Sequence, residues 1–289
     1  MLIDLRSNDL LITAVPTGGF PVASQYVTLN SLPCTDLTNI RITSHNIRSI
    51  YANGSTFEAI NSVLNSDIVA LSKTWTNSNE LPTLTGYNLI THTTRTKHIG
   101  GGSAIFSKHD LPMCSLPEYK ICREKRIELC AAKLQTKKGR NIIIIVCYIG
   151  FIEKEESIDI LLGTIDKIKR DFPHCATVLC GDTNMDLIKM HENNSTYRFN
   201  QELQNRLLLP YIHMPTRVQS KRDGVTSSTC IDNFYCSDDY NKSAKVLVSQ
   251  CGDHYPIFLD IETVVNKKAT EVIYTREMKQ SNIENAEQL

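Results

Sequence analysis

A carboxylate and an amide stand two residues apart in the segment 181–184, whose sequence is Gly-Asp-Thr-Asn. The segment follows the apolar run 176–180, which is typical of a buried strand. Side chains two apart at a strand end point the same way, so Asp182 and Asn184 are expected to face one cleft. A carboxylate there can activate water, and an amide can hold a phosphate. Because Gly-Asp is also typical of a simple turn, the pattern indicates chemistry only together with other residues.

A histidine next to an aspartate, Asp253-His254, precedes the strand-like segment 255–261. Turn chemistry accounts for the aspartate but not for the imidazole. Asp232 lies among strand formers, where burying an unpaired carboxylate is costly. We therefore expect Asp232 to have a buried partner, and His254 is the best candidate.

Further polar residues occur at or near the ends of predicted strands. They are Asn46, Lys73, Glu128 and Tyr148. If the strands form two packed sheets with loops at a common edge, all these groups can converge on one site. Taken singly, Asn46 is equally well explained as a turn former, and Tyr148 as a core aromatic residue with its hydroxyl in water.

Alternating and apolar patterns predict the strands that must position these residues. The predicted strands are residues 40–44, 67–71, 103–106, 127–134, 141–148, 176–180, 230–236, 244–249 and 255–261. Helices are predicted from a capping box at 55–58, with Phe57, Ile60, Val63 and Leu64 on one face, at 158–168 and at about 198–208. The run 141–148 is rich enough in β-branched residues to be a central strand. Three glycines at 100–102 indicate a bend or a close backbone approach.

The composition is that of a globular protein with one large domain. The chain has 289 residues, 41% of them hydrophobic, with 31 basic and 31 acidic residues. A formal net charge of zero provides no global field that attracts nucleic acid, so phosphate recognition must be local. A basic rim formed by six residues is one source of phosphate contacts, although the same residues are equally consistent with solvated loop charges. The six are Arg48, Arg95, Lys97, Arg217, Lys221 and Arg222.

The ten cysteines include no C-x-x-C pair and fall largely in apolar, strand-like segments. Buried free thiols fit this pattern better than a zinc site or disulfides. We therefore expect an intracellular protein, in the nucleus or cytoplasm. The N-terminus has no signal-peptide pattern. No apolar run approaches the ~20 residues that span a bilayer, so no membrane association is expected.

Three segments divide the chain. Residues 1–38 mix proline, glycine and polar residues without a sustained period, and are expected to form a flexible arm outside the core. Residues 39–262 form the predicted domain. Residues 263–289 are polar and charged, which predicts a linker or a solvated helix.

Ten short motifs occur in a specific order along the predicted domain. They are residues 45–49, 67–71, 74–75, 86–89, 100–105, 146–148, 181–184, 215–217, 228–232 and 252–256. In this order they resemble the endonuclease/exonuclease/phosphatase superfamily, which includes deoxyribonuclease I and the abasic-site endonucleases. More closely, they are similar to the endonuclease domain of non-LTR (LINE-type) retrotransposons, in which a reverse transcriptase domain follows.

The resemblance implies an α/β (α+β) fold, a four-layer sandwich with two packed mixed β-sheets flanked by helices. It implies a DNA endonuclease that nicks target DNA with Mg²⁺, or Mn²⁺, and forms no covalent intermediate. Asp182 would orient or deprotonate the water, and Asn184 would hold the phosphate. His254, held by Asp232, would bind the scissile phosphate, and Tyr148 would donate to the same group. The metal residues would be Asn46 and Asp253, and the substrate-binding residues Arg48, Thr216, Arg217 and Ser228.

Lys73 departs from this family pattern, in which a metal-binding glutamate precedes Thr-Trp. At ~4 Å and an effective dielectric constant of about 20, the repulsion between its ammonium and a metal is on the order of 4 kcal/mol per unit of metal charge. That corresponds to a loss of roughly a thousandfold in metal affinity. Lys73 could turn to solvent, lose its proton, or stand in for the metal. A smaller departure is Ile149, where relatives usually carry arginine.

Three functions stay open on the sequence. The first is an active retrotransposon-type endonuclease. The second is a nucleic-acid-binding pseudonuclease, from a decayed or domesticated element, in which Lys73 abolishes turnover. The third is a phosphatase or phospholipid phosphodiesterase of the same fold, against which the retrotransposon-like motifs argue. The sequence does not indicate an oligomeric state.

Overall fold

Every side chain of strand β9 (Ile142–Ile149) is buried, because the strand lies at the centre of a sheet that is covered on both faces. Its side chains alternate between two cores. Ile142, Ile144 and Val146 pack between the two large sheets, whereas the intervening side chains pack against the helices. The prediction of a central strand at this position is confirmed.

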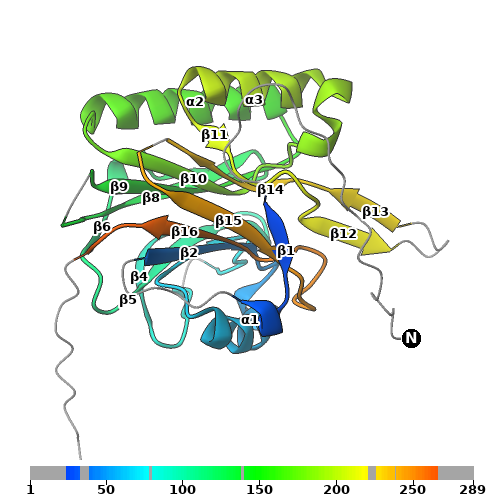
Figure 1. Cartoon of the computed structure of the whole chain (residues 1–289). Helices are drawn as coiled ribbons and strands as arrows, with labels where there is room; N and C mark the ends of the chain where they lie inside the picture. The colour runs from blue at the N-terminus through cyan, green and yellow to red at the C-terminus, as the bar shows by residue number, and fades with distance from the viewer. Residues whose placement is uncertain are drawn as a thin grey trace, which may run out of the picture.

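The computed structural model describes residues 24–32, 39–77, 80–137, 140–220, 226–237 and 239–265. Two large sheets lie face to face between helices, in four layers (Figure 1). The helices α2 (Lys154–Asp171) and α3 (Asn194–Asn205) cover one sheet, and α1 (Ile50–Leu64) covers the other. This architecture confirms the expected α/β sandwich with two mixed sheets and flanking helices.

The first sheet contains seven strands in the order β1-β15-β16-β2-β3-β5-β4. These are β1 (Gln25–Val27), β15 (Lys242–Leu247), β16 (Ile257–Glu262), β2 (Asn39–Asn46), β3 (Ile68–Ser72), β5 (Ser103–Lys108) and β4 (Tyr87–Thr93). Its pairs β1–β15 and β2–β3 are parallel, and the others are antiparallel. Short 3₁₀ helices are η1 (Leu29–Ser31), η2 (Pro117–Tyr119) and η3 (Leu187–Glu192).

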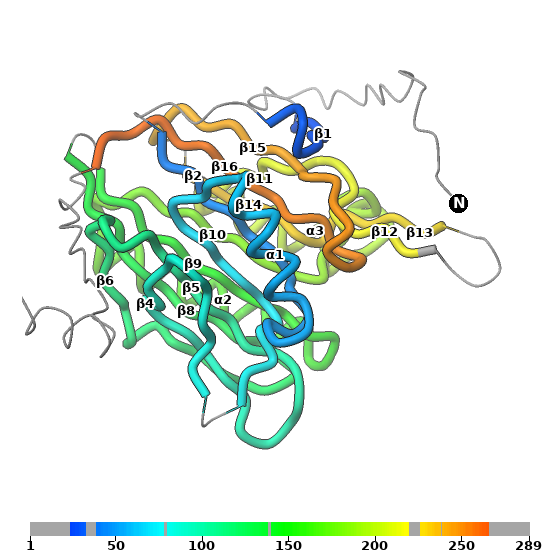
Figure 2. The backbone as a smooth tube through the Cα atoms, turned by 90° about the horizontal axis from the view of Figure 1, so that it is seen from below, coloured from blue at the N-terminus to red at the C-terminus, as the bar shows by residue number. Residues whose placement is uncertain are grey.

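The second sheet has the order β11-β14-β10-β9-β8-β6, with β7 also paired to β8. Besides β9, its strands are β11 (Leu209–Pro210), β14 (Asp232–Cys236), β10 (Ala176–Asp182), β8 (Ile127–Leu134), β6 (Met113–Ser115) and β7 (Ile121–Arg123). Only the pair β9–β10 is parallel among these described strands. A separate hairpin of β12 (Arg217–Ser220) and β13 (Thr226–Thr229) projects from the body of the two sheets (Figures 1 and 2).

Helix α1 begins earlier than the capping box at 55–58 predicts. Ser49 is its N-cap, and the Ser49 side chain accepts a hydrogen bond from the backbone nitrogen of Ala52. The Ser-x-x-Glu pattern therefore lies inside the helix, where it caps nothing. Val63 is 52% exposed and does not belong to the buried face. The other three residues predicted for that face are buried.

Part of the predicted N-terminal arm belongs to the first sheet. Strand β1 pairs in parallel with β15, and Val27 packs in the core beneath α1. The expectation that residues 1–38 lie outside the core is therefore wrong for this strand. Three paired residues are too few to produce a recognisable period in the sequence. The rest of the arm, except residues 24–32, and the predicted linker beyond residue 265 lie outside the described residues.

The cysteines of the described chain are free thiols, as predicted, and most are buried. Cys114 and Cys122 are exposed, contrary to the expectation of burial, because they lie on the short strands β6 and β7 rather than on central strands. Among the described residues, the structure contains no helix with the length and apolar character of a membrane span.

Candidate active site

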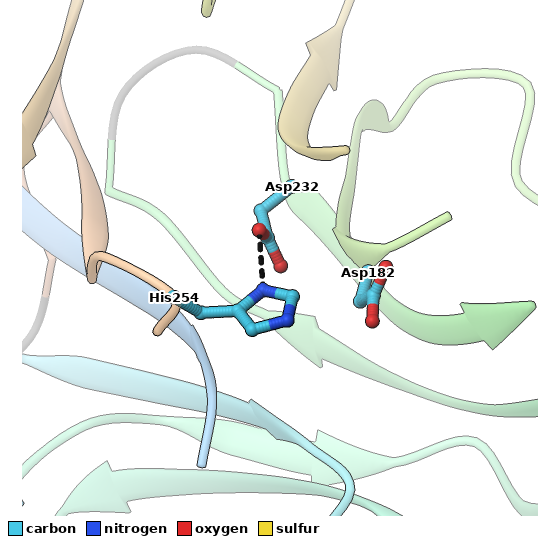
Figure 3. Close-up of side chains that lie close together, drawn as sticks. All are labelled: Asp182, Asp232 and His254. Carbon is cyan, nitrogen blue, oxygen red and sulfur yellow. Dashed lines mark hydrogen bonds and ion pairs between the residues drawn. The ribbon is translucent and has the colours of Figure 1, made fainter. Parts of the chain in front are cut away.

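Three neighbouring strands of the second sheet bring the central polar residues together. Asp182 at the end of β10 lies opposite Tyr148 of β9 and opposite Asp232 of β14. Asn46 ends β2 of the facing sheet, and His254 lies just before β16. Figure 3 shows Asp182, Asp232 and His254 close together. These strand-end residues therefore converge, as predicted, because their strands are neighbours or face each other.

Asp182 is fully buried and hydrogen-bonded through both carboxylate oxygens. Its Oδ2 accepts a hydrogen bond of 2.7 Å from Nδ2 of Asn46 and lies 3.2 Å from Nζ of Lys73. Its Oδ1 accepts from the backbone nitrogen of Asn184 at 3.1 Å. Burial raises the pKa of Asp182, Asp232 raises it further, and Lys73 opposes the shift. The carboxylate is thus positioned rigidly and is more basic than an exposed aspartate.

His254 and Asp232 form the expected buried pair. Nδ1 of His254 lies 2.8 Å from Oδ2 of Asp232, as the dashed line in Figure 3 marks. The hydroxyl of Thr216 donates to the same oxygen at 2.9 Å. Burial lowers the pKa of His254, but the nearby carboxylates, Asp232 first, outweigh it, so the net shift is upward. Thr216 is buried against Asp232, so it positions this pair; its expected contact with substrate stays a prediction.

Asn46 connects the two halves of this cluster. Its Nδ2 lies 2.7 Å from Oδ2 of Asp182 and 3.2 Å from Nε2 of His254. An amide nitrogen has two hydrogens, so it can donate to both groups when Asp232 holds the proton of His254 on Nδ1. Among the described residues, the buried Oδ1 of Asn46 has no hydrogen-bond partner. An unsatisfied acceptor of this kind marks a place where a further donor can bind.

Lys73 enters the same site from the end of β3. Its side chain is 16% exposed, with Nζ 3.2 Å from Asp182 Oδ2 and 4.7 Å from the centre of the Tyr148 ring. Burial raises the pKa of Tyr148 to about 12, so its phenol remains a hydrogen-bond donor at neutral pH. A cation therefore lies between a carboxylate and an aromatic face.

The glycines at 100–102 lie against a buried ion pair near the ring of Tyr148. Arg95 pairs with Glu128, and the backbone nitrogen of Gly102 donates to the same carboxylate. Gly101 has a φ of +76° and no room for a Cβ between these two side chains. The guanidinium of Arg95 lies 6.0 Å from the Tyr148 ring centre. The close backbone approach predicted from the glycines is present, whereas Arg95 was expected on an exposed rim and is buried instead.

Asp253 is held by two arginines. Arg48 pairs with its Oδ1, and Nε of Arg217 lies 2.8 Å from its Oδ2. Burial would raise the pKa of Asp253, but the hydrogen bonds from Arg217 and Arg48 hold it at about 2. Of the predicted substrate-binding residues, these two arginines are thus neutralised within the protein. Ser228 lies exposed on β13, in the projecting hairpin.

Asn184 has a left-handed backbone conformation, with a φ of 52°, which asparagine adopts more readily than most residues. Its Nδ2 donates to the backbone oxygen of Ile149 at 2.6 Å, and Nζ of Lys154 donates to the backbone oxygen of Asn184 at 2.8 Å. The amide nitrogen is therefore used inside the protein. The backbone nitrogen of Asn184 positions Asp182 instead, and its expected phosphate contact stays a prediction.

The suitability of the site for a divalent metal depends on these contacts. Asp182, Asp232 and His254 each offer a ligand atom, and these atoms lie within 4.8 Å of one another. However, the ammonium of Lys73 already contacts Asp182, and two guanidinium groups hold Asp253. Lys73 also stands at the position that the resemblance assigns to a metal-binding glutamate. Arranged in this way, the residues do not fit a divalent ion.

Comparison with known proteins places the fold. No family model and no curated protein matches the chain. The endonuclease domain of TRAS1, a telomere-specific non-LTR retrotransposon, is 16% identical with a TM-score of 0.59, over 77% of this chain and 98% of that one. An endonuclease/exonuclease/phosphatase family protein from Bacteroides thetaiotaomicron is 14% identical, with a TM-score of 0.55, over 79% and 96%.

A third solved structure carries nucleic acid. It is the 3′ phosphatase NExo from Neisseria bound to a product DNA hairpin, 16% identical with a TM-score of 0.58, over 78% of this chain and 99% of that one. At this level of identity the likeness concerns the fold. The chain thus has the fold of the endonuclease/exonuclease/phosphatase proteins, among which nucleases and phosphatases, including a retrotransposon endonuclease, are its structural neighbours.

Proposed function

We propose that this chain hydrolyses phosphodiester bonds in DNA, as an endonuclease of the retrotransposon type that nicks its target. The observation that supports this most is the hydrogen-bonded chain from Asp182 through Asn46 to His254 and Asp232. It joins a buried base to a carboxylate-oriented imidazole, which is a combination suited to hydrolysis. The fold of the TRAS1 endonuclease domain and the ordered motifs of the sequence support the substrate class.

In this proposal, Asp182 accepts a proton from the attacking water. Its raised pKa makes it a better base than an exposed carboxylate, and three neighbours hold its oxygens in position. As the water oxygen bonds to phosphorus, the bond to the leaving oxygen breaks. The leaving oxygen takes its proton from His254 or from solvent. No protein atom bonds to phosphorus, so no covalent intermediate forms.

Negative charge on the phosphate is met by donors that are already oriented. Asp232 keeps a proton on Nδ1 of His254, so Nε2 accepts from Asn46 in the neutral ring. In the protonated ring Nε2 carries a proton and donates to the phosphate in place of this contact. The phenol of Tyr148 adds a neutral donor. Such fixed donors stabilise developing charge without reorganising. Dependence on Mg²⁺ or Mn²⁺ is supported by the resemblance and by the grouping of Asp182, Asp232 and His254, while the roles of Asp182, His254 and Tyr148 involve only protein groups and water.

Plasmid nicking tests the proposal, with supercoiled DNA in Mg²⁺, in Mn²⁺ and in EDTA. We expect nicking by the wild-type protein under at least one condition. Asp182→Ala removes the base and is expected to lower the rate at least ~100-fold. Asp159→Ala, which changes an exposed carboxylate on α2, is the matched control and keeps the wild-type rate. Equal background from wild type and Asp182→Ala in all three conditions would sink the proposal.

The ion pair between Lys73 and Asp182 favours a second candidate, a pseudonuclease that binds nucleic acid without cutting it. A salt bridge to the base lowers its ability to accept a proton. In that case wild type binds DNA but does not nick it, and Lys73→Glu gains nicking that depends on Mg²⁺. Measuring DNA binding and nicking on the same preparations separates the two candidates.

A further inference from the structure

The backbone around Lys73 is held by hydrogen bonds to two other segments, one at Ser49 and one at the glycines 101 and 102. The backbone oxygen of Lys73 accepts from the backbone nitrogen of Ser49 at 2.9 Å. The next two residues along the chain donate to the facing glycines, with Trp75 at 2.8 Å from the oxygen of Gly101. Lys73 itself has a φ of 54°, a conformation that persists only when the surroundings enforce it. The direction of its side chain is therefore set by the fold.

The partners of the ammonium group are ones that attract a cation. One is the fully buried carboxylate of Asp182, at 3.2 Å, and the other is the face of Tyr148, at 4.7 Å from the ring centre. A carboxylate and an aromatic face together hold a desolvated positive charge more firmly than either does alone. Of the alternatives left open by the sequence, the structure thus disagrees with a Lys73 that turns to solvent.

The charges of the cluster balance without any added ion. Its carboxylates are Asp182, Asp232 and Asp253, and its permanent cations are Lys73, Arg48 and Arg217. With His254 neutral, these six groups carry no net charge, and protonation of His254 makes the cluster positive. A glutamate at position 73 would instead leave two net negative charges, which a divalent cation neutralises. With His254 protonated the cluster attracts an anion, and with His254 neutral it has no excess negative charge to attract a divalent cation.

We infer that Lys73 is the built-in cation of this site, and that the site binds the phosphate of its substrate without a divalent metal. Nζ of Lys73 lies 3.2 Å from Oδ2 of Asp182, the oxygen that also accepts a hydrogen bond from Asn46. Its charge therefore lies beside the base of the proposed mechanism, where the phosphate is attacked. This inference deepens the proposed function, on which the identity of the anion rests. It replaces a metal Lewis acid with a fixed ammonium.

Binding of a fluorescein-labelled 12-base-pair DNA duplex in EDTA tests the first half of the inference. We expect wild type to bind, and added Mg²⁺ to change the Kd less than ~2-fold. Lys73→Met removes one charge-assisted hydrogen bond and is expected to weaken binding ~10-fold or more. Lys73→Arg keeps the charge and retains most of the affinity. Lys167→Met, on the exposed face of α2, is the matched control and binds like wild type.

Binding of Mn²⁺ alone, followed by electron paramagnetic resonance, tests the second half without any turnover. Wild type is expected to show no saturable binding below ~1 mM, because the cluster has no negative charge to spare. Lys73→Glu is expected to bind Mn²⁺ at least ~100-fold more tightly, since it exchanges repulsion for attraction. Lys167→Glu makes the same change in net charge and should behave like wild type. Thermal unfolding of each variant verifies that it is folded.

The outcomes distinguish the inference from the proposed function. Tight Mn²⁺ binding by wild type, or loss of DNA binding in EDTA, overturns the inference. The proposed hydrolysis is still supported in that case if the protein nicks DNA in Mg²⁺. Metal-independent DNA binding that depends on Lys73, without nicking under any condition, upholds the inference and removes the proposed hydrolysis. Equal DNA affinity of wild type and folded Lys73→Met also overturns the inference.

Discussion

At the scale of single residues, neighbours along one strand serve different purposes. Successive side chains of β2 point to opposite faces of the sheet. Asn46 therefore faces Asp182 and His254, whereas His45 points to the helical side and stacks on Phe57, with ring centres 5.4 Å apart. Among the described residues, neither ring nitrogen of His45 has a hydrogen-bond partner. Asn46 thus follows directly after a buried histidine whose imidazole has no partner for a second proton within the described part of the chain and stays neutral.

The first prediction concerns this imidazole. Burial, with a contribution from His254, lowers the pKa of His45 from 6.5 to about 3. Between the pKa values of about 3 and 6.5, His45 is protonated in the unfolded chain but neutral in the folded protein. The free energy of unfolding therefore falls as the pH drops below about 6.5. We expect the free energy of unfolding to be ~2 kcal/mol lower at pH 5 than at pH 7.5 from this residue alone.

Urea unfolding at the two pH values measures this effect. His45→Phe keeps the stack on Phe57 and removes the titration, so its loss between pH 7.5 and pH 5 should be ~2 kcal/mol smaller than that of wild type. His109→Phe, at an exposed turn, is the control and should retain the wild-type difference. If wild type and His45→Phe lose the same stability, His45 is not held neutral by the fold.

At the scale of elements, the site depends on how closely β9 and β10 approach each other. Gly181 has a φ of +123°, and a Cβ there would overlap the backbone carbonyl of Cys147 on the neighbouring strand. Backbone cannot yield as a flexible side chain does. The glycine therefore allows β10 to deliver Asp182 opposite Tyr148.

Filling the space between these two strands should therefore disturb both folding and the site. Gly181→Ala is expected to lower the free energy of unfolding by at least ~2 kcal/mol, from overpacking and from the strained φ. It should also lower nicking of plasmid DNA, because Asp182 is displaced. Gly163→Ala is the matched control: it lies in α2, where an added methyl group meets no atom beyond the neighbouring residues and backbone of its own helix, and it should raise stability by ~0.5–1 kcal/mol. A wild-type urea midpoint for Gly181→Ala would contradict this account of the strand pair.

At the scale of the whole molecule, charge limits how DNA can be bound. The formal net charge is zero. Of the six residues predicted to form a basic rim, Arg48 and Arg217 pair with Asp253, and Arg95 pairs with Glu128. Lys97 is exposed, and Lys221 and Arg222 lie outside the described residues. Of the four rim residues that the structure describes, three are thus held in ion pairs within the protein.

We therefore expect DNA binding with a weak dependence on salt. If about three phosphates are neutralised, log K should fall with log [KCl] with a slope no steeper than about −3. Fluorescence anisotropy with a labelled duplex between 50 and 200 mM KCl measures the slope, roughly the range over which highly basic proteins lose most of their affinity. A slope steeper than about −5 would falsify the view that the site, rather than a basic surface, provides the phosphate contacts.

The sequence by itself determined the longer buried strands, but it missed β4 and the short strands β1, β6, β7, β11, β12 and β13. The predicted range 127–134 coincides with β8, and 141–148 matches β9 to within one residue. These patterns are local, since alternation and apolar runs reflect the burial of each strand's own faces. The same locality explains the failures at α1 and β1, where a capping pattern recurred inside a helix and a strand was too short to show a period.

The sequence also indicated which polar residues lie at strand ends, and the structure brings Asn46, Asp182 and His254 together, while their roles stay predictions. Only the tertiary structure decided their partners. Lys73 contacts Asp182, more than a hundred positions away, while Arg95 is buried against Glu128 rather than exposed. Asp253, expected to hold a metal, pairs with arginines instead. Such pairings follow from sheet order, register and backbone conformation at loops such as residues 73–75. These are set by contacts between distant segments, which local patterns do not encode.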